Sequence, residues 1–181
     1  MRTYNLSQIT FDNVRVPKEN LIGRDGRGFV VAMKTLDAGR LGLGAACTGA
    51  AKELLEMSAT YAKERRQFDQ SIANFQAIQF MLAEMATLIF TMESIVYRTA
   101  VDYDLGKSIS KQSAMVKLYC SEALDRVVDF AVQIHGGMGY SQELSIERFY
   151  RDSRINRIFE GTNEIQKGII AREIIKKNGK F

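Results

Sequence analysis

Residues 75–104 read FQAIQFMLAEMATLIFTMESIVYRTAVDYD and contain neither proline nor glycine. Apolar side chains recur in this stretch at three- and four-residue spacing, at Ile78, Met81, Leu82, Met85, Leu88 and Ile89. That spacing places them on one face of an α-helix. The stretch therefore predicts a long amphipathic helix that buries one face, and a fold built on helix–helix packing.

The rest of the chain favours more helices of the same kind. Pro17 is the only proline, so the residue that breaks helices most strongly is absent from everything after it. Apolar periodicity predicts further helices over residues 29–65, 110–135 and 162–177, and a short helical stretch near 144–150. Short links between long helices favour antiparallel neighbours. The predicted fold class is all-α: an antiparallel four-helix up-and-down bundle with a short N-terminal β-like segment.

The first residues follow a different pattern. Within residues 4–16, Ile9, Phe11, Val14 and Val16 resemble a strand with a turn at Asp12-Asn13, and Pro17 ends the extended piece. Glycine-marked residues 20–28 predict a loop that leads into the first helix.

Small residues crowd the first predicted helix. It contains Ala38, Gly39, Gly42, Gly44, Ala45, Ala46, Gly49 and Ala50. A glycine inside a helix costs roughly 1 kcal/mol relative to alanine. So many small residues indicate close packing against another helix or a ligand.

Composition excludes several classes of function. The net charge is only +4, with no basic block and no tryptophan, which gives little support to nucleic-acid binding. Cys47 and Cys120 lie far apart, and His135 is the single histidine, so neither a zinc site nor a Ser/His triad is expected. We expect no secretory signal and no apolar run of transmembrane length, and hence a soluble protein of a reducing compartment.

Residues 158–166 place an acidic side chain directly before the last helix. Thr162 is the predicted N-cap, and Glu160 precedes it across Gly161. A carboxylate there would lie beside free backbone N–H groups at the positive end of the helix. Gly161 lacks a Cβ and would let a flat ligand approach the main chain. From spacing alone, an acidic residue near an ordinary cap is the simpler interpretation.

The order of residues in this segment favours a catalytic role. Residues 159–166 closely resemble the Tyr/Phe-Glu-Gly-Thr-x-x-Ile-Gln signature of the flavin-dependent acyl-CoA dehydrogenases. Other segments resemble that family in the same order, at residues 11–23, 36–40, 61–68, 75–80, 133–140 and 151–152. The resemblance implies that residues 1–23 are the end of a middle β-domain and its linker, and that residues 24–181 are the C-terminal helical bundle.

The resemblance also implies a reaction, FAD-dependent α,β-desaturation of an acyl-CoA thioester, and therefore a role in fatty acid metabolism. Glu160 would be the base that removes the α-proton. In some branches of the family the base precedes the arginine of the first long helix, where this chain has Gly39. Substrate contacts would come from Asp37, Gly39, Arg40 and Gly161, although Asp37 and Arg40 also fit an ordinary i,i+3 ion pair.

The FAD-binding residues implied by the resemblance fall into three segments. They are Arg65, Phe68 and Gln76; then Gln133, Ile134, His135, Gly136 and Gly137; and finally Thr162, Asn163 and Glu164. Residues 133–137 resemble a segment that contacts the FAD of a neighbouring subunit. Among these, His135 is expected to be structural rather than catalytic.

The implied partners are an acyl-CoA, an electron-transferring flavoprotein and further copies of the chain, as a dimer or a tetramer. The expected location is the cytoplasm, or the mitochondrial matrix in a eukaryote. Since the family's other two domains hold much of the flavin, this chain alone is expected to be an incomplete, inactive part of the enzyme. Two alternatives remain open: a non-catalytic helical oligomerisation module, and a flavoprotein acyl oxidase or carrier-protein desaturase.

Overall fold

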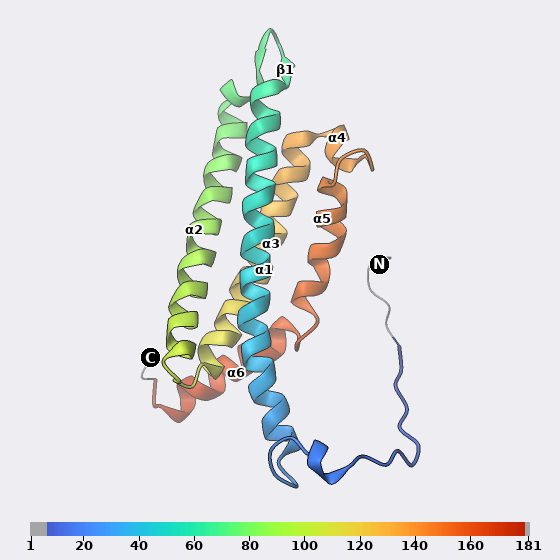
Figure 1. Cartoon of the computed structure of the whole chain (residues 1–181). Helices are drawn as coiled ribbons and strands as arrows, with labels where there is room; N and C mark the ends of the chain where they lie inside the picture. The colour runs from blue at the N-terminus through green and yellow to red at the C-terminus, as the bar shows by residue number, and fades with distance from the viewer. Residues whose placement is uncertain (1–6, 180–181) are drawn as a thin grey trace.

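The computed structural model describes residues 7–179, and Figure 1 shows long helices standing side by side. The chain ascends through α1 (Gly28–Glu64), descends through α2 (Gln76–Asp104) and ascends again through α3 (Ser110–His135). The short α4 (Gly137–Tyr140) leads to α5 (Ile146–Ser153), which runs back down beside α3, followed by η3 (Arg154–Arg157). The all-α bundle predicted from the sequence is confirmed, and neighbouring upright helices are antiparallel.

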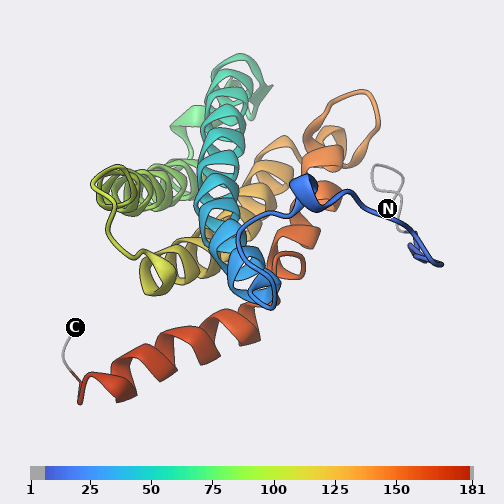
Figure 2. The same ribbon diagram turned by 60° about the horizontal axis from the view of Figure 1, so that its bottom comes forward.

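The last helix, α6 (Asn163–Lys176), lies across the base of the upright helices and packs on α3 (Figure 2). The short α5 is the fourth upright element. The predicted helix boundaries hold within a few residues, because glycine or polar links separate the periodic segments. Gly136 ends α3 at a φ of 58°, a conformation that favours glycine.

Helix α3 is the centre of the core, because it contacts α1, α2, α5 and α6. The buried apolar cluster draws on each of the three long helices and on Ile146 of α5, with Ala51, Leu54, Met85, Met92, Cys120, Leu124 and Val127 among its members. The small residues of α1 let α3 approach closely. A Cβ added at Gly44 would lie only 2.2 Å from Val116 Cγ1, so the predicted close packing is confirmed there.

The connection between α1 and α2 is a small hairpin followed by η2 (Ile72–Asn74). Strands β1 (Arg66–Gln67) and β2 (Gln70–Ser71) pair antiparallel, with Gln67 opposite Gln70. The two turn residues, Phe68 and Asp69, have φ of 50° and 62°. Two positive φ values in succession give the twist that matches a tight hairpin. The sequence predicted only a short link between two helices here.

Residues 7–17 are extended and exposed, but contain no strand. A bend at Asp12-Asn13 matches the predicted turn, and the short η1 (Lys18–Asn20) follows Pro17. Strand pairing needs a second strand, and none lies beside these residues within the described part of the chain. Residues 4–6 of the predicted β-like segment lie outside the described residues. Assignment of residues 1–23 to a β-domain stays a prediction.

The expectation that no apolar run reaches transmembrane length is wrong for α2. This helix is long and apolar enough to cross a membrane, judged by length and composition alone. It packs one face into the bundle through Met85, Leu88, Ile89 and Met92. Such a core helix passes the same test, which makes the finding weak support for a membrane span.

Candidate functional site

The segment singled out in the sequence forms a tight turn between η3 and α6. Glu160 has a φ of 56° and Gly161 a φ of 89°. Thr162 then caps α6, its hydroxyl accepting a hydrogen bond from the Ile165 N–H at 3.4 Å, as predicted. A positive φ is unfavourable for a residue with a side chain and persists only where the surroundings hold it. Glu160 is therefore held in place by other residues.

Two buried side chains hold the turn. Arg40 Nε donates to the carbonyl oxygen of Glu160 at 3.2 Å. Gln166 Nε2 donates to the carbonyl oxygens of Glu160 at 3.3 Å and of Gly161 at 2.9 Å. Arg40 also forms the i,i+3 ion pair with Asp37 at 3.0 Å, so that structural interpretation of the pair is confirmed. The Asp37–Arg40 ion pair holds the Arg40 guanidinium in the position from which it binds the turn.

The Glu160 carboxylate lies directly against α1. A Cβ added at Gly39 would lie 2.9 Å from Glu160 Oε2 and 3.1 Å from Oε1. Oε2 is buried and has no hydrogen-bond partner among the described residues. A buried oxygen without a donor is costly in a folded protein, and such a group is explained by a catalytic role or by a bound water, ion or ligand. The carboxylate is thus available for a proton or a ligand.

A buried polar network lies beneath the turn. Lys117 Nζ of α3 donates to Asn163 Oδ1 at 2.6 Å, and Asn163 Nδ2 donates to Ser121 Oγ at 3.0 Å and to Glu122 Oε1 at 3.3 Å. Lys117 is fully buried and Asn163 nearly so. Burial, followed by the charge of Arg40, lowers the pKa of Lys117 to about 8. The side chain of Asn163 therefore faces the bundle interior.

Sequence reasoning missed Lys117 and Gln166. A signal for the first was present: Lys117 falls three residues after Ala114 and seven before Leu124, on the apolar stripe of its helix. A charged residue there must find a buried polar partner. Gln166 belongs to the recognised signature, but its function as a clamp depends on where the turn lies in space.

The other predicted FAD residues meet at the opposite end of the bundle, at the hairpin and α4 in Figure 1. Arg65 caps the C-terminus of α1, Phe68 is 85% exposed at the hairpin tip, and Gln76 begins α2. The His135 ring stacks on Tyr61 of α1 with ring centroids 4.4 Å apart, which brings the end of α3 beside the end of α1.

Residues 133–137 divide into exposed and buried members. Gln133, Gly136 and Gly137 are exposed, whereas Ile134 and His135 are buried. His135 Nδ1 lies 2.7 Å from the Ala131 carbonyl oxygen, and burial lowers the pKa of His135 below its ordinary value. These contacts agree with the structural role expected for His135.

The predicted FAD residues thus form two groups far apart. Gly39, at the Glu160 turn, and Arg65 lie on one helix and are separated by about 39 Å at about 1.5 Å per residue. Thr162, Asn163 and Glu164 belong to the Glu160 end. A single extended FAD is too short to contact both ends of α1 in one chain.

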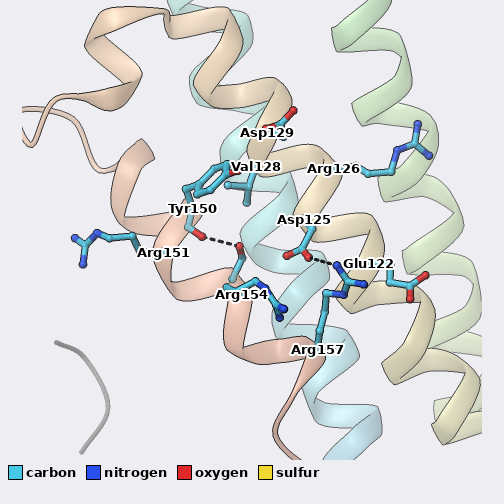
Figure 3. Close-up of a pocket in the computed structure, with 10 residues that line it drawn as sticks. Glu122, Asp125, Arg126, Val128, Asp129, Tyr150, Arg151, Arg154 and Arg157 are labelled. Atoms are coloured by element: carbon cyan, nitrogen blue, oxygen red, sulfur yellow. Dashed lines mark hydrogen bonds and ion pairs between the residues drawn. The ribbon is translucent and has the colours of Figure 1, made fainter. Parts of the chain in front are cut away.

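A cleft of about 840 Å³ between α3 and the α5–η3 segment contains none of the predicted site residues (Figure 3). Charged side chains line much of it, and Arg157 Nη1 donates to Asp125 Oδ2 at 3.2 Å. Burial raises the pKa of Asp125 above its ordinary value, while Arg157 opposes that shift. The turn residues do not line this cleft, but Glu122, which does, accepts a hydrogen bond from Asn163 at the start of α6.

Comparison with known proteins gives a consistent result. Residues 26–175 match the family model described as acyl-CoA dehydrogenase, C-terminal domain. The chain is 46% identical over 171 residues to the caffeyl-CoA reductase-Etf complex subunit CarC of Acetobacterium woodii, covering 94% of this chain and 45% of that protein. It is 42% identical over 176 residues to the mitochondrial short-chain specific acyl-CoA dehydrogenase of Rattus norvegicus, covering 97% of this chain and 43% of that protein.

Solved structures agree. The butyryl-CoA dehydrogenase of Megasphaera elsdenii superimposes with a TM-score of 0.89 at 40% identity, covering 91% of this chain and 43% of that chain. The prolyl acyl carrier protein oxidase AnaB matches with a TM-score of 0.86 at 31% identity, covering 90% and 43% of the two chains. The chain therefore spans less than half the length of these relatives.

Proposed function

This chain belongs to the acyl-CoA dehydrogenase family, as its C-terminal domain, and on that premise we propose that it carries the catalytic base of an FAD-dependent enzyme acting on an acyl-CoA thioester. Glu160 would remove the α-proton of the bound acyl group as the acyl chain is desaturated between its α and β carbons. The observation that supports this most directly is the buried, unpartnered Oε2 of Glu160 above Gly39.

Each residue of the turn has a distinct part in the proposal. Arg40 and Gln166 hold the Glu160 and Gly161 carbonyls, so the carboxylate keeps one position. Gly39 leaves the space that the carboxylate occupies, and the α-carbon of a bound substrate would have to come within reach of that carboxylate. A base held ready in this way requires little rearrangement when substrate binds, and such orientation can supply a large part of a rate enhancement.

The two separated groups of residues would suit FAD in a symmetric assembly. The Glu160 end would serve one flavin, while Arg65, Phe68, Gln76 and residues 133–137 would contact the phosphates and adenine of the neighbour's FAD. A Cβ added at Gly136 or Gly137 would meet no atom within 4 Å, so the backbone there is open to a ligand. The guanidinium of Arg65 suits a pyrophosphate. FAD, when bound, supplies the acceptor for the β-hydride.

The names of relatives favour a second direction for the same chemistry. The caffeyl-CoA reductase-Etf complex subunit and the acryloyl-CoA reductase (NADH) of Anaerotignum propionicum, 44% identical over 171 residues, are both called reductases. In the reductive direction Glu160 would return the proton to the α-carbon. The relative that is a subunit of an Etf complex also supports an electron-transferring flavoprotein as the redox partner.

The test joins this chain to the flavin-binding half of the Megasphaera butyryl-CoA dehydrogenase and measures exchange of the α-protons of butyryl-CoA in D2O. Glu160→Gln should bind FAD and butyryl-CoA normally and lose most of the exchange. Glu173→Gln, in the exposed i,i+3 ion pair with Lys176 on α6, is the matched control and should exchange as the unmodified protein does.

Near-normal exchange in Glu160→Gln would refute the assignment of the base. The direction is then decided by comparing dye reduction by butyryl-CoA with reduction of crotonyl-CoA by a reduced dye. Faster turnover with oxygen than with dye would instead favour the oxidase alternative. A chimera that binds FAD but neither exchanges protons nor turns over would favour the non-catalytic oligomerisation module.

A further inference from the structure

Lys117 is an unusual residue for the centre of a helical bundle. It is fully buried on α3, and its Nζ lies 2.6 Å from Asn163 Oδ1. Asn163 is the first residue of α6 and follows the Glu160–Gly161–Thr162 turn directly. The ammonium group therefore lies beneath the start of α6, the positive end of the helix dipole, where a cation is unfavourable.

The charges that act on Lys117 come from α1, from the Glu160 turn and from α6. Arg40 of α1 is a second cation nearby and also holds the Glu160 carbonyl. Glu160 in the turn and Glu164 of α6 oppose that effect, whereas burial raises the pKa of the Cys47 thiol of α1 to about 12, so this thiol carries no charge near pH 8. From α3 itself, Glu122 Oε1 accepts from Asn163 Nδ2. The lysine thus shares one electrostatic environment with the proposed base.

We propose that Lys117 is a positioning residue for the Glu160 turn: its ammonium group anchors Asn163, and loss of its proton weakens that anchor and shifts the turn. This rests on the proposed function only for its consequence in catalysis. A hydrogen bond from a charged donor is roughly twice as strong as one from a neutral donor. A pKa of about 8 places the change of charge at a moderately alkaline pH.

Asn163 transmits the change to the turn. Its side chain is held at both ends, by Lys117 on one side and by Ser121 and Glu122 on the other. A weaker bond to Lys117 lets Asn163 shift toward its remaining partners on α3. Because Thr162, Gly161 and Glu160 precede Asn163 directly, the carbonyls held by Arg40 and Gln166 must readjust.

The experiment is a pH titration of the 181-residue chain by carbon-detected NMR. Three chemical shifts are followed: that of Lys117 Cε and those of the carbonyl carbons of Glu160 and Gly161. In the unmodified chain all three should change with one shared midpoint near pH 8. Lys117→Met keeps the chain length without a charge and should abolish the alkaline movement of both carbonyls. Lys52→Met, in an exposed ion pair with Glu93, is the control and should leave it unchanged.

Asn163→Ala tests the same coupling if Lys117→Met does not fold. In that variant Lys117 should still titrate, but the two carbonyl shifts should no longer follow it. The proposal is overturned if Lys117 titrates with a midpoint above pH 10, or if the carbonyl shifts do not change at the Lys117 midpoint. It is also overturned if the carbonyl shifts still follow Lys117 in Asn163→Ala. Coupling without Glu160-dependent α-proton exchange would leave the positioning role intact and refute only the proposed function.

Discussion

The carboxylate of Glu160 fills the space that a side chain at Gly39 would occupy, with Oε2 only 2.9 Å from the Cβ position. The two residues are far apart in the chain and meet because α1 passes under the turn before α6. Position 39 is where other branches of the family are expected to carry their base. The structure brings both positions to one place, so under the proposed function a base at either position would reach the same substrate carbon.

Gly39→Ala should therefore impair the base without unfolding the protein. The added methyl group forces the carboxylate away by a few tenths of an ångström or more, and misplaced catalytic groups lose about tenfold to a hundredfold in rate. The measurement is α-proton exchange in the chimera described above.

Gly42→Ala is the matched control for this substitution. It lies on the same helix, is exposed, and its added Cβ would meet no atom within 4 Å. Exchange should be unaffected, while helix propensity should raise the free energy of unfolding by up to about 1 kcal/mol. Equal exchange in both variants would show that the contact with Gly39 has no part in positioning Glu160.

Gly44→Ala should destabilise the bundle. Its Cβ would clash with Val116 Cγ1 at 2.2 Å and crowd Val96 Cγ2 at 3.3 Å, and overpacking of this kind costs about 1–3 kcal/mol. The measurement is the free energy of unfolding in urea, with exposed Gly49→Ala as a control that should be neutral or stabilising. A stabilised Gly44→Ala would mean that α1 and α3 separate more easily than their packing indicates.

The helices could be predicted from sequence because their information is local. Apolar spacing, the absence of proline after Pro17 and the cap at Thr162 fix where helices begin and end, and the family signature identified Glu160. The hydrogen bonds that fix the Glu160 backbone could not be predicted in the same way. They depend on Arg40 and Gln166 converging on one turn, which follows from how α1 and α6 meet. The direction of α6 across the base is likewise a property of tertiary packing.

The buried Lys117 predicts a pH dependence of stability. Its folded pKa of about 8 is below the ordinary 10.5, so between these values the unfolded chain binds a proton that the folded chain does not. The free energy of unfolding therefore gains a contribution that rises with pH in this window. Below pH 8 both states are protonated, and the cost of the buried charge is fully present.

The check is chemical denaturation of the unmodified chain and of Lys117→Met from pH 7 to 10. Subtracting the two curves removes the titration of other groups. Relative to that of Lys117→Met, the free energy of unfolding of the unmodified chain should increase as the pH rises above 8. A difference that stays constant across this range would show that Lys117 keeps its proton in the folded protein.

Arg65→Ala should weaken FAD binding and leave chemistry at saturating FAD far less affected. Arg65 is exposed at the end of α1, so its loss should change the free energy of unfolding little. Titration of the chimera with FAD, followed by flavin fluorescence, measures the first effect, and urea unfolding measures the second. Lost stability together with unchanged FAD affinity would show Arg65 to be structural.

The 181-residue chain by itself should form an oligomer and lack dehydrogenase activity. Large apolar side chains remain exposed along the outer face of α2, at Phe80, Phe90, Tyr97 and Val101. An apolar face of this kind indicates an interaction surface, and we expect a second copy of the chain to cover it. Light scattering should give a mass above that of the 20.4 kDa chain, and Phe90→Glu should lower it.

Inactivity follows from the separation of the two groups of FAD residues along α1. One chain offers the Glu160 turn at one end and the Arg65 hairpin at the other, about 39 Å away, so FAD bound at the hairpin cannot also meet Glu160 of that chain. Association of copies would have to align both ends around one flavin without the parts that the longer relatives contain. Loss of proximity and orientation removes about 7–11 kcal/mol of catalytic advantage, so acyl-CoA-dependent dye reduction with added FAD should be undetectable. A monomeric mass would refute the assembly prediction, and turnover comparable to that of the chimera would show that the helical bundle alone positions the flavin.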